Sequence, residues 1–441
     1  MRTPPARPPR TQYICPGETH PISRSVHLAR LAAFFPACRD CPLRTDAGQL
    51  SGETRQWLES TRRRVPRPSL FTDEGVRGVH LNELTRPRAA KIAAAFAHLL
   101  WDDFPLASAG GSAARGVRRA GPAIVVGHDE RPSAPDLVTG VISSLRRMSC
   151  RVIDIRLATV PAFRFAIDHL QAAGGIFVTG SGCDPSWIGL DFVRAGGRPL
   201  SRGDGLERLE EASNSAHSRP TRHGGTYRTF QAGVPYEAGL WKHFHALRPL
   251  RIACGSPLAS QRKLLARLFE RLPCALTALA LPVRRRDVYD ADDADVRRVA
   301  ARVRDESAHL GLVIDDDGQR CGFLDETGEL VPPRSIARLI AEVTLSESAG
   351  RRVAIEGDLP DSLRESIAQL GGEPIDAGRT QSEMWRALAA GAVYGGGDAG
   401  RHWFNEPSPT SDAVLALARV LQALSRGDAP FSAVAHASSG Q

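Results

Sequence analysis

The sequence predicts an α/β protein built from three consecutive α/β/α domains, with mixed, mostly parallel sheets around a central cleft and a small N-terminal Cys/His module. Two observations predict this class. Short apolar strands alternate with helix-forming segments from residue 68 onward, and the alternation restarts twice. Parallel strands joined by covering helices produce this pattern. The length of 441 residues agrees with about three domains of roughly 150 residues each.

The first round occupies residues 68–201. Its strands are expected in AIVVGHD, CRVIDIRLA and GGIFVTG, and its helices in PDLVTGVISSLRRM and AFRFAIDHLQAA. The stretch 202–235 is polar and rich in Gly, Ser and Pro, which is typical of a linker or long loop. The first domain is therefore expected to end near residue 201.

The second round occupies residues 236–333 and the third residues 334–430, followed by a short tail at 431–441. The expected strands are LRIACGS, LGLVIDDDG, RRVAIEG and AVYGGGDAG, and the helices are SQRKLLARLFERL, PRSIARLIAEVTL, DSLRESIAQLG, QSEMWRALAAG and DAVLALARVLQAL. Each round carries a polar loop at a strand end. These loops are expected to face one shared cleft.

The N-terminal region differs in composition from the rest. Residues 1–67 hold twelve arginines against five acidic residues, so most of the net charge of +8 lies there. We expect a disordered basic tail at 1–10, a Cys/His-rich module at 11–50 and a linker at 51–67. A basic arm could contact nucleic acid, but a solvated tail explains the same composition, and nucleic-acid binding is not favoured.

The module offers Cys15, His20 and the pair Cys38-x-x-Cys41 as candidate ligands of a structural zinc ion. Zinc favours tetrahedral Cys/His sets, and a Cys-x-x-Cys turn with a second, distant pair is a usual source. The alternative is a small helical module around HLARLAAFF in which the thiols are free. The module is also a candidate contact for a protein partner.

Other classes are not supported by the composition. No apolar run approaches the roughly 20 residues that a membrane span needs, and the sequence MRTPPARPPR lacks the apolar core of a secretory signal. We therefore expect a cytoplasmic protein that does not bind membranes.

Five collinear motifs carry a family resemblance. These are FTDEGVRG, VVGHDERPSAP, GGIFVTGSGCDPSWIGLDF, LGLVIDDDGQRCGFLDETGELVPP and GAVYGGGDAGRHWF. They resemble, in this order, the opening motif, the V-G-x-D-x-R-x-S-S-P motif, the serine loop, the metal loop and the sugar-recognition loop of the α-D-phosphohexomutase superfamily. These are the phosphoglucomutases and phosphomannomutases. The resemblance covers about residues 68–430.

The resemblance implies a chemistry for these loops. Ser181 falls on the serine that carries a phosphoryl group, and Asp315, Asp317 and Gln319 fall on the positions of three aspartates that hold Mg²⁺ with that phosphate. The substrate would be a hexose phosphate or a related small anion. Transfer would depend on positioning and on neutralising charge in a loose transition state.

The same comparison shows departures from the family pattern. Gly182 and Cys183 replace the His and Asn after the serine, and Asp191 coincides with a lysine near the transferring phosphate. An anion at that position opposes a phosphoserine. Gln319 replaces the third aspartate of the metal loop, so weaker Mg²⁺ binding is expected. The alternative is an acidic turn that ends a strand.

Four arginines are candidate phosphate or substrate ligands: Arg77, Arg131, Arg320 and Arg401. Arg131 could instead brace its loop. In the sugar loop, Gly397 and Ala399 replace a Glu and a Ser, which makes hexose recognition there doubtful. The chain ends about where the family's fourth, phosphate-binding domain would begin, so the resemblance implies a divergent member without it.

Two functions are therefore weighed. One is a phosphoglucomutase/phosphomannomutase-like intramolecular phosphotransferase, an isomerase using phosphoserine and Mg²⁺, with impaired or lost mutase activity. The other is a non-catalytic sugar-phosphate-binding or regulatory protein, a pseudoenzyme whose zinc-binding N-terminal module contacts a partner. Function depends on the site rather than on the fold, so the arrangement of the loops must decide between them.

Overall fold

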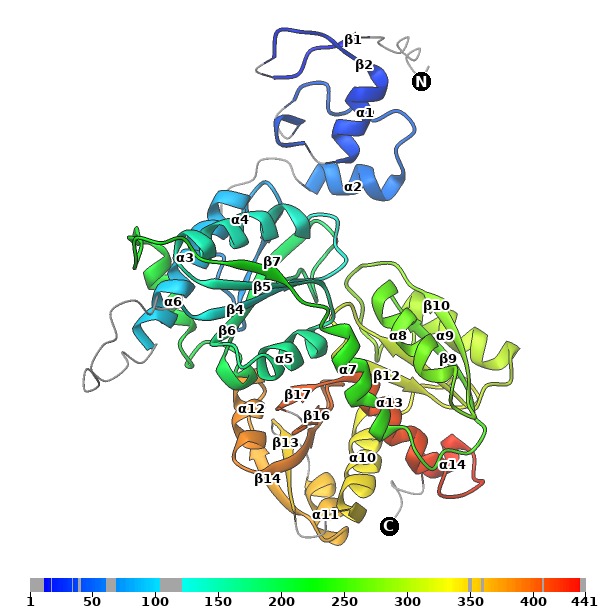
Figure 1. Cartoon of the computed structure of the whole chain (residues 1–441). Helices are drawn as coiled ribbons and strands as arrows, with labels where there is room; N and C mark the ends of the chain where they lie inside the picture. Colours follow the sequence, from blue (N-terminus) through cyan, green and yellow to red (C-terminus); the bar gives the residue numbers. More distant parts are fainter. Residues whose placement is uncertain are drawn as a thin grey trace, which may run out of the picture.

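The computed structural model describes residues 12–16, 18–33, 35–38, 41–60, 69–103, 121–347, 351–357, 361–406 and 408–436. This described part is a mixed α/β fold with sheets of two, four, five and six strands. The small N-terminal elements lie at one end, beside the unit that holds the six-stranded sheet (Figure 1). The mixed α/β class expected from the sequence is confirmed. The basic tail expected at residues 1–10 lies outside the described residues.

The N-terminal module has few buried apolar side chains. Its elements are β1 (Gln12–Tyr13), β2 (Ile22–Ser23), α1 (Arg24–Ala32), the 3-10 helix η1 (Pro36–Cys38) and α2 (Gly52–Ser60). Helix α1 begins where the Ser23 hydroxyl accepts a hydrogen bond from the Val26 amide at 3.3 Å, an N-cap arrangement. Among the described residues, the hydrophobic cluster of the module has Leu31, Cys38 and Leu58 at its centre.

The six-stranded unit spans residues 69–229. Its elements are β3 (Val76–Val79), α3 (Arg86–Asp103), β4 (Ala123–His128), α4 (Ala134–Arg147), β5 (Arg151–Leu157), α5 (Val160–His169), β6 (Gly174–Val178), β7 (Trp187–Arg194), η2 (Ala195–Gly197), α6 (Leu206–Ser213) and β8 (Tyr227–Thr229). The strand order is β3-β7-β6-β4-β5-β8. Strands β6, β4, β5 and β8 run parallel, whereas β7 and β3 are antiparallel to their neighbours.

The central strand β4 shows why both faces of this sheet are covered. Ile124 and Val126 belong to the core beneath α3 and α4, while Val125 belongs to the core that includes Phe163 of α5. Successive side chains of a strand point to opposite faces. A continuous apolar strand is therefore buried on both sides.

The stretch 202–235 contains more structure than a linker. Helix α6 buries Leu206 and Leu209, and β8 pairs in parallel with β5, with Tyr227 opposite Val152. All three residues of β8 are exposed, so an apolar pattern could not predict this strand. The expected boundary of the first domain near residue 201 does not coincide with the edge of its sheet.

The four-stranded unit spans residues 233–324. Its elements are α7 (Gly233–Leu240), η3 (Trp241–His243), β9 (Arg251–Ser256), α8 (Ala259–Phe269), β10 (Ala275–Ala280), α9 (Ala294–Asp305), β11 (Leu310–Ile314) and β12 (Cys321–Leu324). Its order is β10-β9-β11-β12, with β12 antiparallel to β11. The turn between β11 and β12 carries the acidic loop.

The five-stranded unit spans residues 333–436. Its elements are α10 (Pro333–Glu347), β13 (Arg352–Glu356), α11 (Asp361–Gln369), β14 (Glu373–Ala377), α12 (Gln381–Ala389), β15 (Ala392–Gly396), β16 (Trp403–Phe404), β17 (Thr410–Ser411), α13 (Ala413–Leu424) and α14 (Phe431–His436). Its order is β14-β13-β15-β16-β17. The expected tail at 431–441 begins instead as helix α14, in which Phe431 is 1% exposed.

The three larger units share one continuous core. A single buried cluster contains Phe163 of the six-stranded unit, Leu312 of the four-stranded unit and Leu417 of α13. Figure 1 shows α13 between the second and third sheets. The units are therefore packed together over apolar surface, which holds their loops in a fixed relation. Within the described residues, no helix is both long enough and apolar enough to cross a membrane.

Candidate active site

The serine loop follows strand β6 and is shaped by a carboxylate at the end of β4. Asp129 Oδ2 accepts hydrogen bonds from Thr179 Oγ1 at 2.9 Å and from the Gly180 amide at 3.1 Å. The Ser181 amide in turn donates to Thr179 Oγ1 at 3.0 Å. Gly182 has a φ of +72° with open space around it, a backbone conformation that glycine adopts without strain. These contacts hold Ser181 at the tip of the loop.

The acidic loop of the β11–β12 turn faces this serine. Ser181 Oγ lies 3.1 Å from Asp316 Oδ1 and 3.1 Å from Asp317 Oδ2. The Gly182 amide also donates to Asp316 Oδ1, at 3.3 Å. The structure therefore brings two of the sequence-predicted residues together, Ser181 and Asp317. It adds Asp316, which lies at a glycine position of the family's metal-loop pattern.

The acidic loop is buried and crowded with negative charge. Asp315, Asp316 and Asp317 are 2%, 2% and 4% exposed. Burial raises the pKa of Asp315 well above its usual value, and the charges of Asp316 and Asp317 raise it further. The backbone amide of Gln319 donates to Asp317 Oδ1 at 2.7 Å. The buried side-chain oxygen of Gln319, Oε1, has no donor among the described residues.

Arg131 braces the two loops. Its guanidinium donates to the carbonyl oxygens of Cys183 and Asp184 at 3.1 and 2.9 Å and to Asp316 Oδ2 at 2.6 Å. Its side chain is 1% exposed. These hydrogen bonds agree with the alternative expected from the sequence, in which Arg131 braces its loop. Phosphate binding by Arg131 stays a prediction, because Nη1 and Nη2 of its guanidinium group already have acceptors in the two loops.

Arg77 is also paired within the protein. On strand β3 it donates to Asp191 Oδ1 of β7 at 2.5 Å. Arg77 lies opposite Gly189 in the strand register, and a Cβ at Gly189 would come within 2.7 Å of Arg77 Cδ. Burial raises the pKa of Asp191, while Arg77 acts to lower it. The acid at the family's lysine position therefore neutralises a predicted phosphate ligand.

The other two predicted arginines lie side by side. Arg320 and Arg401 form an isolated β-bridge, and Arg320 Nε donates to the Ala399 carbonyl oxygen at 2.9 Å. The Ala399 amide donates to Glu356 Oε2 at 3.1 Å. The Nε atom of Arg401 is buried and has no acceptor among the described residues.

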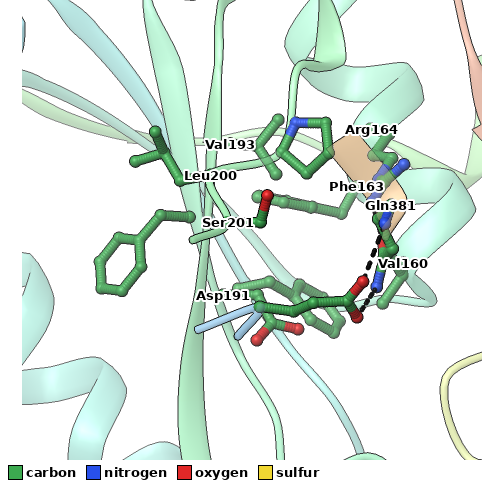
Figure 2. A pocket seen from close by; sticks show the side chains of 12 residues that line it. Val160, Phe163, Arg164, Asp191, Val193, Leu200, Ser201 and Gln381 are labelled. Carbon is green, nitrogen blue, oxygen red and sulfur yellow. Dashed lines mark hydrogen bonds between the residues drawn. The ribbon is translucent and has the colours of Figure 1, made fainter. Parts of the chain in front are cut away.

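A small pocket lies between the first and third sheets, next to the serine loop. Figure 2 shows Arg164, Asp191, Ser201 and Gln381 around it. The Gln381 amide and Nε2 donate to Glu74 at 2.8 and 3.0 Å, and Arg164 donates to Gln381 Oε1. Burial lowers the pKa of Arg164 to about 10. Sequence reasoning missed these contacts, although Glu74 lies inside the FTDEGVRG motif.

The four predicted zinc ligands are not all together. Cys15, Cys38 and Cys41 are buried free thiols, and Cys15 and Cys41 are close enough to Cys38 to add to the effect of burial, which raises its pKa to about 11. His20 is exposed and hydrogen-bonds to Thr19 at 3.1 Å. Across the described ranges, no three His, Cys, Asp or Glu side chains are arranged to hold a metal ion.

Comparisons with known proteins show what the sequence is similar to. The family described as phosphoglucomutase/phosphomannomutase, alpha/beta/alpha domain I, matches residues 68–219. A curated protein named phosphohexose mutases, from Xanthomonas campestris pv. campestris (strain B100), is 27% identical over 297 residues, which cover 64% of this chain and 65% of that protein. The phosphomannomutase/phosphoglucomutase of Pseudomonas aeruginosa (strain PAO1) is 25% identical over 317 residues, covering 70% and 67%.

A solved structure supports the fold. The phosphoglucomutase/phosphomannomutase family protein of Burkholderia thailandensis superposes with a TM-score of 0.73 and 23% identity, covering 84% of this chain and 80% of that one. Three mixed sheets with a serine facing buried carboxylates define the class of this α/β protein. The matches to residues 68–219 and to these relatives support phosphomannomutase/phosphoglucomutase-like ancestry, within the α-D-phosphohexomutase superfamily. The chain spans 65% of the length of the Xanthomonas relative.

Proposed function

We propose that this protein binds a hexose phosphate, or a related small anion, in the cleft, and that its phosphoryl-transfer activity is impaired or lost. The contact between Ser181 and Asp316 carries the proposal. A phosphoserine bears a charge of about −1.5 to −2 at neutral pH. At Ser181 it would stand beside the carboxylates of Asp316 and Asp317, both within 3.1 Å of the hydroxyl oxygen.

The arginine side chains near Ser181 already interact with other groups of the protein, which limits how far they can neutralise a phosphoserine. Arg131 is engaged by two loop carbonyl oxygens and Asp316, and Arg77 is engaged by Asp191. Two unit charges 4 Å apart repel by about 4 kcal/mol at an effective dielectric constant of 20. Negative charges at so short a distance repel each other. They therefore oppose phosphorylation of Ser181 unless a cation binds between them.

Magnesium is the cation that the family implies, and the oxygens present suit it chemically. Mg²⁺ prefers carboxylate, amide and water oxygens and keeps several waters. Asp317 would supply a carboxylate and Gln319 its unpartnered Oε1, with Asp315 in the same buried loop. When bound, Mg²⁺ would neutralise charge on a phosphoryl group at Ser181. With an amide in place of a third carboxylate, we expect weak binding.

Anion binding is assigned to the far end of the β11–β12 turn, where it adjoins the loop that holds Arg401. Arg320 and Arg401 lie together there, and the Arg401 Nε atom has no acceptor among the described residues. Buried guanidinium groups without acceptors are costly, and a phosphate accepts well-oriented hydrogen bonds from such groups. A sugar phosphate could therefore bind without being turned over.

The test separates binding from turnover. Calorimetry with glucose 6-phosphate should show binding to the wild type that Arg401→Met weakens by at least about tenfold, the loss expected for one charged hydrogen bond. Conversion of glucose 1-phosphate or mannose 1-phosphate, with Mg²⁺ and a bisphosphate activator, should stay far below the usual range of roughly 1–10³ per second. Turnover within that range, abolished in Ser181→Ala, would contradict the loss of activity. Absence of any sugar-phosphate binding would contradict the whole proposal.

A regulatory role is the second candidate, and one observation favours it. Ile14, Val26 and Phe35 of the N-terminal module are 58%, 42% and 39% exposed. A small module that exposes several large apolar side chains could use them to contact another protein. In this candidate, replacing Val26 and Phe35 with Asp should abolish a specific complex while sugar-phosphate binding in the cleft is kept.

A further inference from the structure

Strand β8 forms one open edge of the six-stranded sheet. It is the last strand in the order β3-β7-β6-β4-β5-β8, and it pairs in parallel with β5 alone. Its three residues, Tyr227, Arg228 and Thr229, are all exposed. No element of the described part of the chain therefore covers this strand.

The backbone of β8 has hydrogen-bonding groups that face away from the sheet. The Thr226 carbonyl oxygen accepts from β5 at 2.9 Å, and the Phe230 amide donates to β5 at 3.0 Å. The even-numbered residues thus face β5, because successive residues of a strand turn their N–H and C=O groups to opposite edges. The backbone groups of Tyr227 and Thr229 therefore point outward, and they have no partner among the described residues.

The side chains of β8 lie on two different faces. Tyr227 is 44% exposed, and its hydroxyl donates to Asp154 Oδ2 of β5 at 2.8 Å. Thr229 lies on the same face as Tyr227 and Arg228 on the opposite face, since the side chains of a strand alternate. A strand added at this edge would therefore meet an aromatic ring on one face and a guanidinium group on the other.

The surroundings of this edge are basic. Residues 212–236, which include β8, contain three arginines and no acidic residue. Arg222 and Arg228 are exposed, as is Arg156 near the end of β5. None of these three side chains has an ion-pair partner among the described residues. An acidic segment would therefore meet unpaired positive charge here.

The same charges decide between the possible occupants of the edge. A second copy paired antiparallel about Arg228 would place two arginines opposite each other, and like charges in that position are destabilising. The longer segments outside the described residues, 1–11, 61–68 and 104–120, contain arginines and no acidic residue. Neither a second copy nor these segments complement the edge, whereas an acidic strand of another protein does.

We propose that β8 binds an extended, acidic segment of a partner protein, which adds a strand to the six-stranded sheet. Tyr227 and Thr229 each supply one outward backbone donor and one acceptor, and pairing with a sheet edge is a recurring mode of peptide recognition. Apolar side chains of the partner pack on Tyr227, and the acidic side chains that alternate with them face Arg228. Because the strand is short, the contact with Arg228 contributes a large part of the affinity.

The test measures binding of a short fluorescein-labelled peptide of alternating Glu and Val residues to the full-length chain, by fluorescence anisotropy at low salt. The wild type should bind it with a dissociation constant below about 1 mM and should not bind the matched Lys/Val peptide. Arg228→Glu should weaken binding roughly tenfold, because attraction becomes repulsion. Arg285→Glu, the same charge change at an exposed arginine of the four-stranded unit, should bind like the wild type.

Hydrogen exchange measured by mass spectrometry tests the geometry of the complex. The bound Glu/Val peptide should slow exchange in fragments that contain residues 226–230. Thr229→Pro removes one outward amide and keeps the bonds to β5, because proline is tolerated on an edge strand where its missing N–H would face solvent. This variant should bind the peptide more weakly than the wild type at an unchanged melting temperature.

The proposal would be overturned if the wild type did not bind the Glu/Val peptide or bound the Lys/Val peptide equally well. Undiminished binding in Arg228→Glu would have the same consequence. Unchanged exchange at residues 226–230 with peptide bound would show that the acidic peptide binds elsewhere on a basic protein. A wild-type dimer that dissociates in Thr229→Pro would assign the edge to a second copy instead.

Discussion

Ser181 and Asp316 meet across the cleft although they are 135 residues apart in the chain: the serine hydroxyl donates to Asp316 Oδ1 at 3.1 Å. The other oxygen of Asp316 accepts from Arg131 at 2.6 Å. One carboxylate therefore ties the serine loop, its bracing arginine and the acidic loop together. In the proposed function, this carboxylate also opposes a phosphoryl group on Ser181 by charge repulsion.

Removing the Asp316 side chain should make Ser181 easier to phosphorylate. Asp316→Gly deletes one carboxylate beside the hydroxyl, where unit charges repel by a few kcal/mol. After incubation with glucose 1,6-bisphosphate and Mg²⁺, intact mass should show a larger phosphoryl adduct than in the wild type. The double variant Asp316→Gly with Ser181→Ala is the control and should show none. An unchanged or smaller adduct in Asp316→Gly would mean that repulsion by Asp316 is not the obstacle.

Restoring an acid at position 319 should strengthen magnesium binding. Gln319→Asp adds a carboxylate where the amide oxygen has no donor among the described residues, and each added charge in such a site tightens Mg²⁺. The rise in melting temperature caused by MgCl₂ should be larger than in the wild type. Gln261→Asp, which changes a buried glutamine of α8 that is not one of the predicted metal ligands, is the comparison. A larger magnesium response there than in Gln319→Asp would contradict the assignment.

Gly189→Ala should destabilise the six-stranded sheet. The added Cβ would lie 1.9 Å from the Val76 carbonyl oxygen, so strands β3 and β7 must separate. Overpacking of this kind costs about 1–3 kcal/mol, and thermal unfolding should occur at a lower temperature. Gly233→Ala is the matched control, because its Cβ would meet nothing within 4 Å. Equal melting temperatures for the two variants would show that the strands yield without cost.

Glu130→Ala should loosen the first and second sheets from each other. The Glu130 carboxylate accepts hydrogen bonds from the amides of Ala259 and Ser260 at 2.8 and 2.7 Å, at the N-terminus of α8. Leaving these donors unpaired costs about 1–3 kcal/mol. Calorimetry should show a lower melting temperature, and Glu130→Gln, which keeps an acceptor, should lie between. The exposed Glu365→Ala should have no effect, and an equal loss there would contradict the contact's role.

His402 should make the protein sensitive to acid. It is fully buried, and burial lowers its pKa to about 3, whereas the unfolded chain titrates near 6.5. Between these values the unfolded state binds the extra proton, so stability is full above about pH 6.5 and falls as the pH drops. At pH 5 the loss is roughly 2 kcal/mol.

The variant His402→Gln should lose this part of the pH dependence. Its melting temperature should change less between pH 7 and pH 5 than that of the wild type, whereas the exposed His223→Gln should follow the wild type. An identical pH profile for His402→Gln would show that other groups dominate acid unfolding.

Most elements of the fold could be predicted because their signal is local. The helix α13 and the strands β4, β5, β6, β9 and β11 lie within the expected segments, and the helices α4, α5, α8 and α10 extend one or two residues beyond theirs. Strand β8 could not be predicted, because its three residues are exposed and only pairing with β5 defines it. The same holds for α14, whose position depends on burial of Phe431 against the shared core.

For the candidate site, the sequence predicted the residue types and the order of the loops, but it could not predict which side chains contact one another. The motifs by themselves determined the superfamily and singled out Ser181 and Asp317, because short loops after strands keep their local pattern. Only the tertiary structure decided that Asp316 contacts Ser181, that Arg77 is neutralised by Asp191 and that Arg131 is engaged by loop carbonyls. Those partners come from different strands and sheets, and packing of the shared core, which no local pattern encodes, brings them within hydrogen-bonding distance.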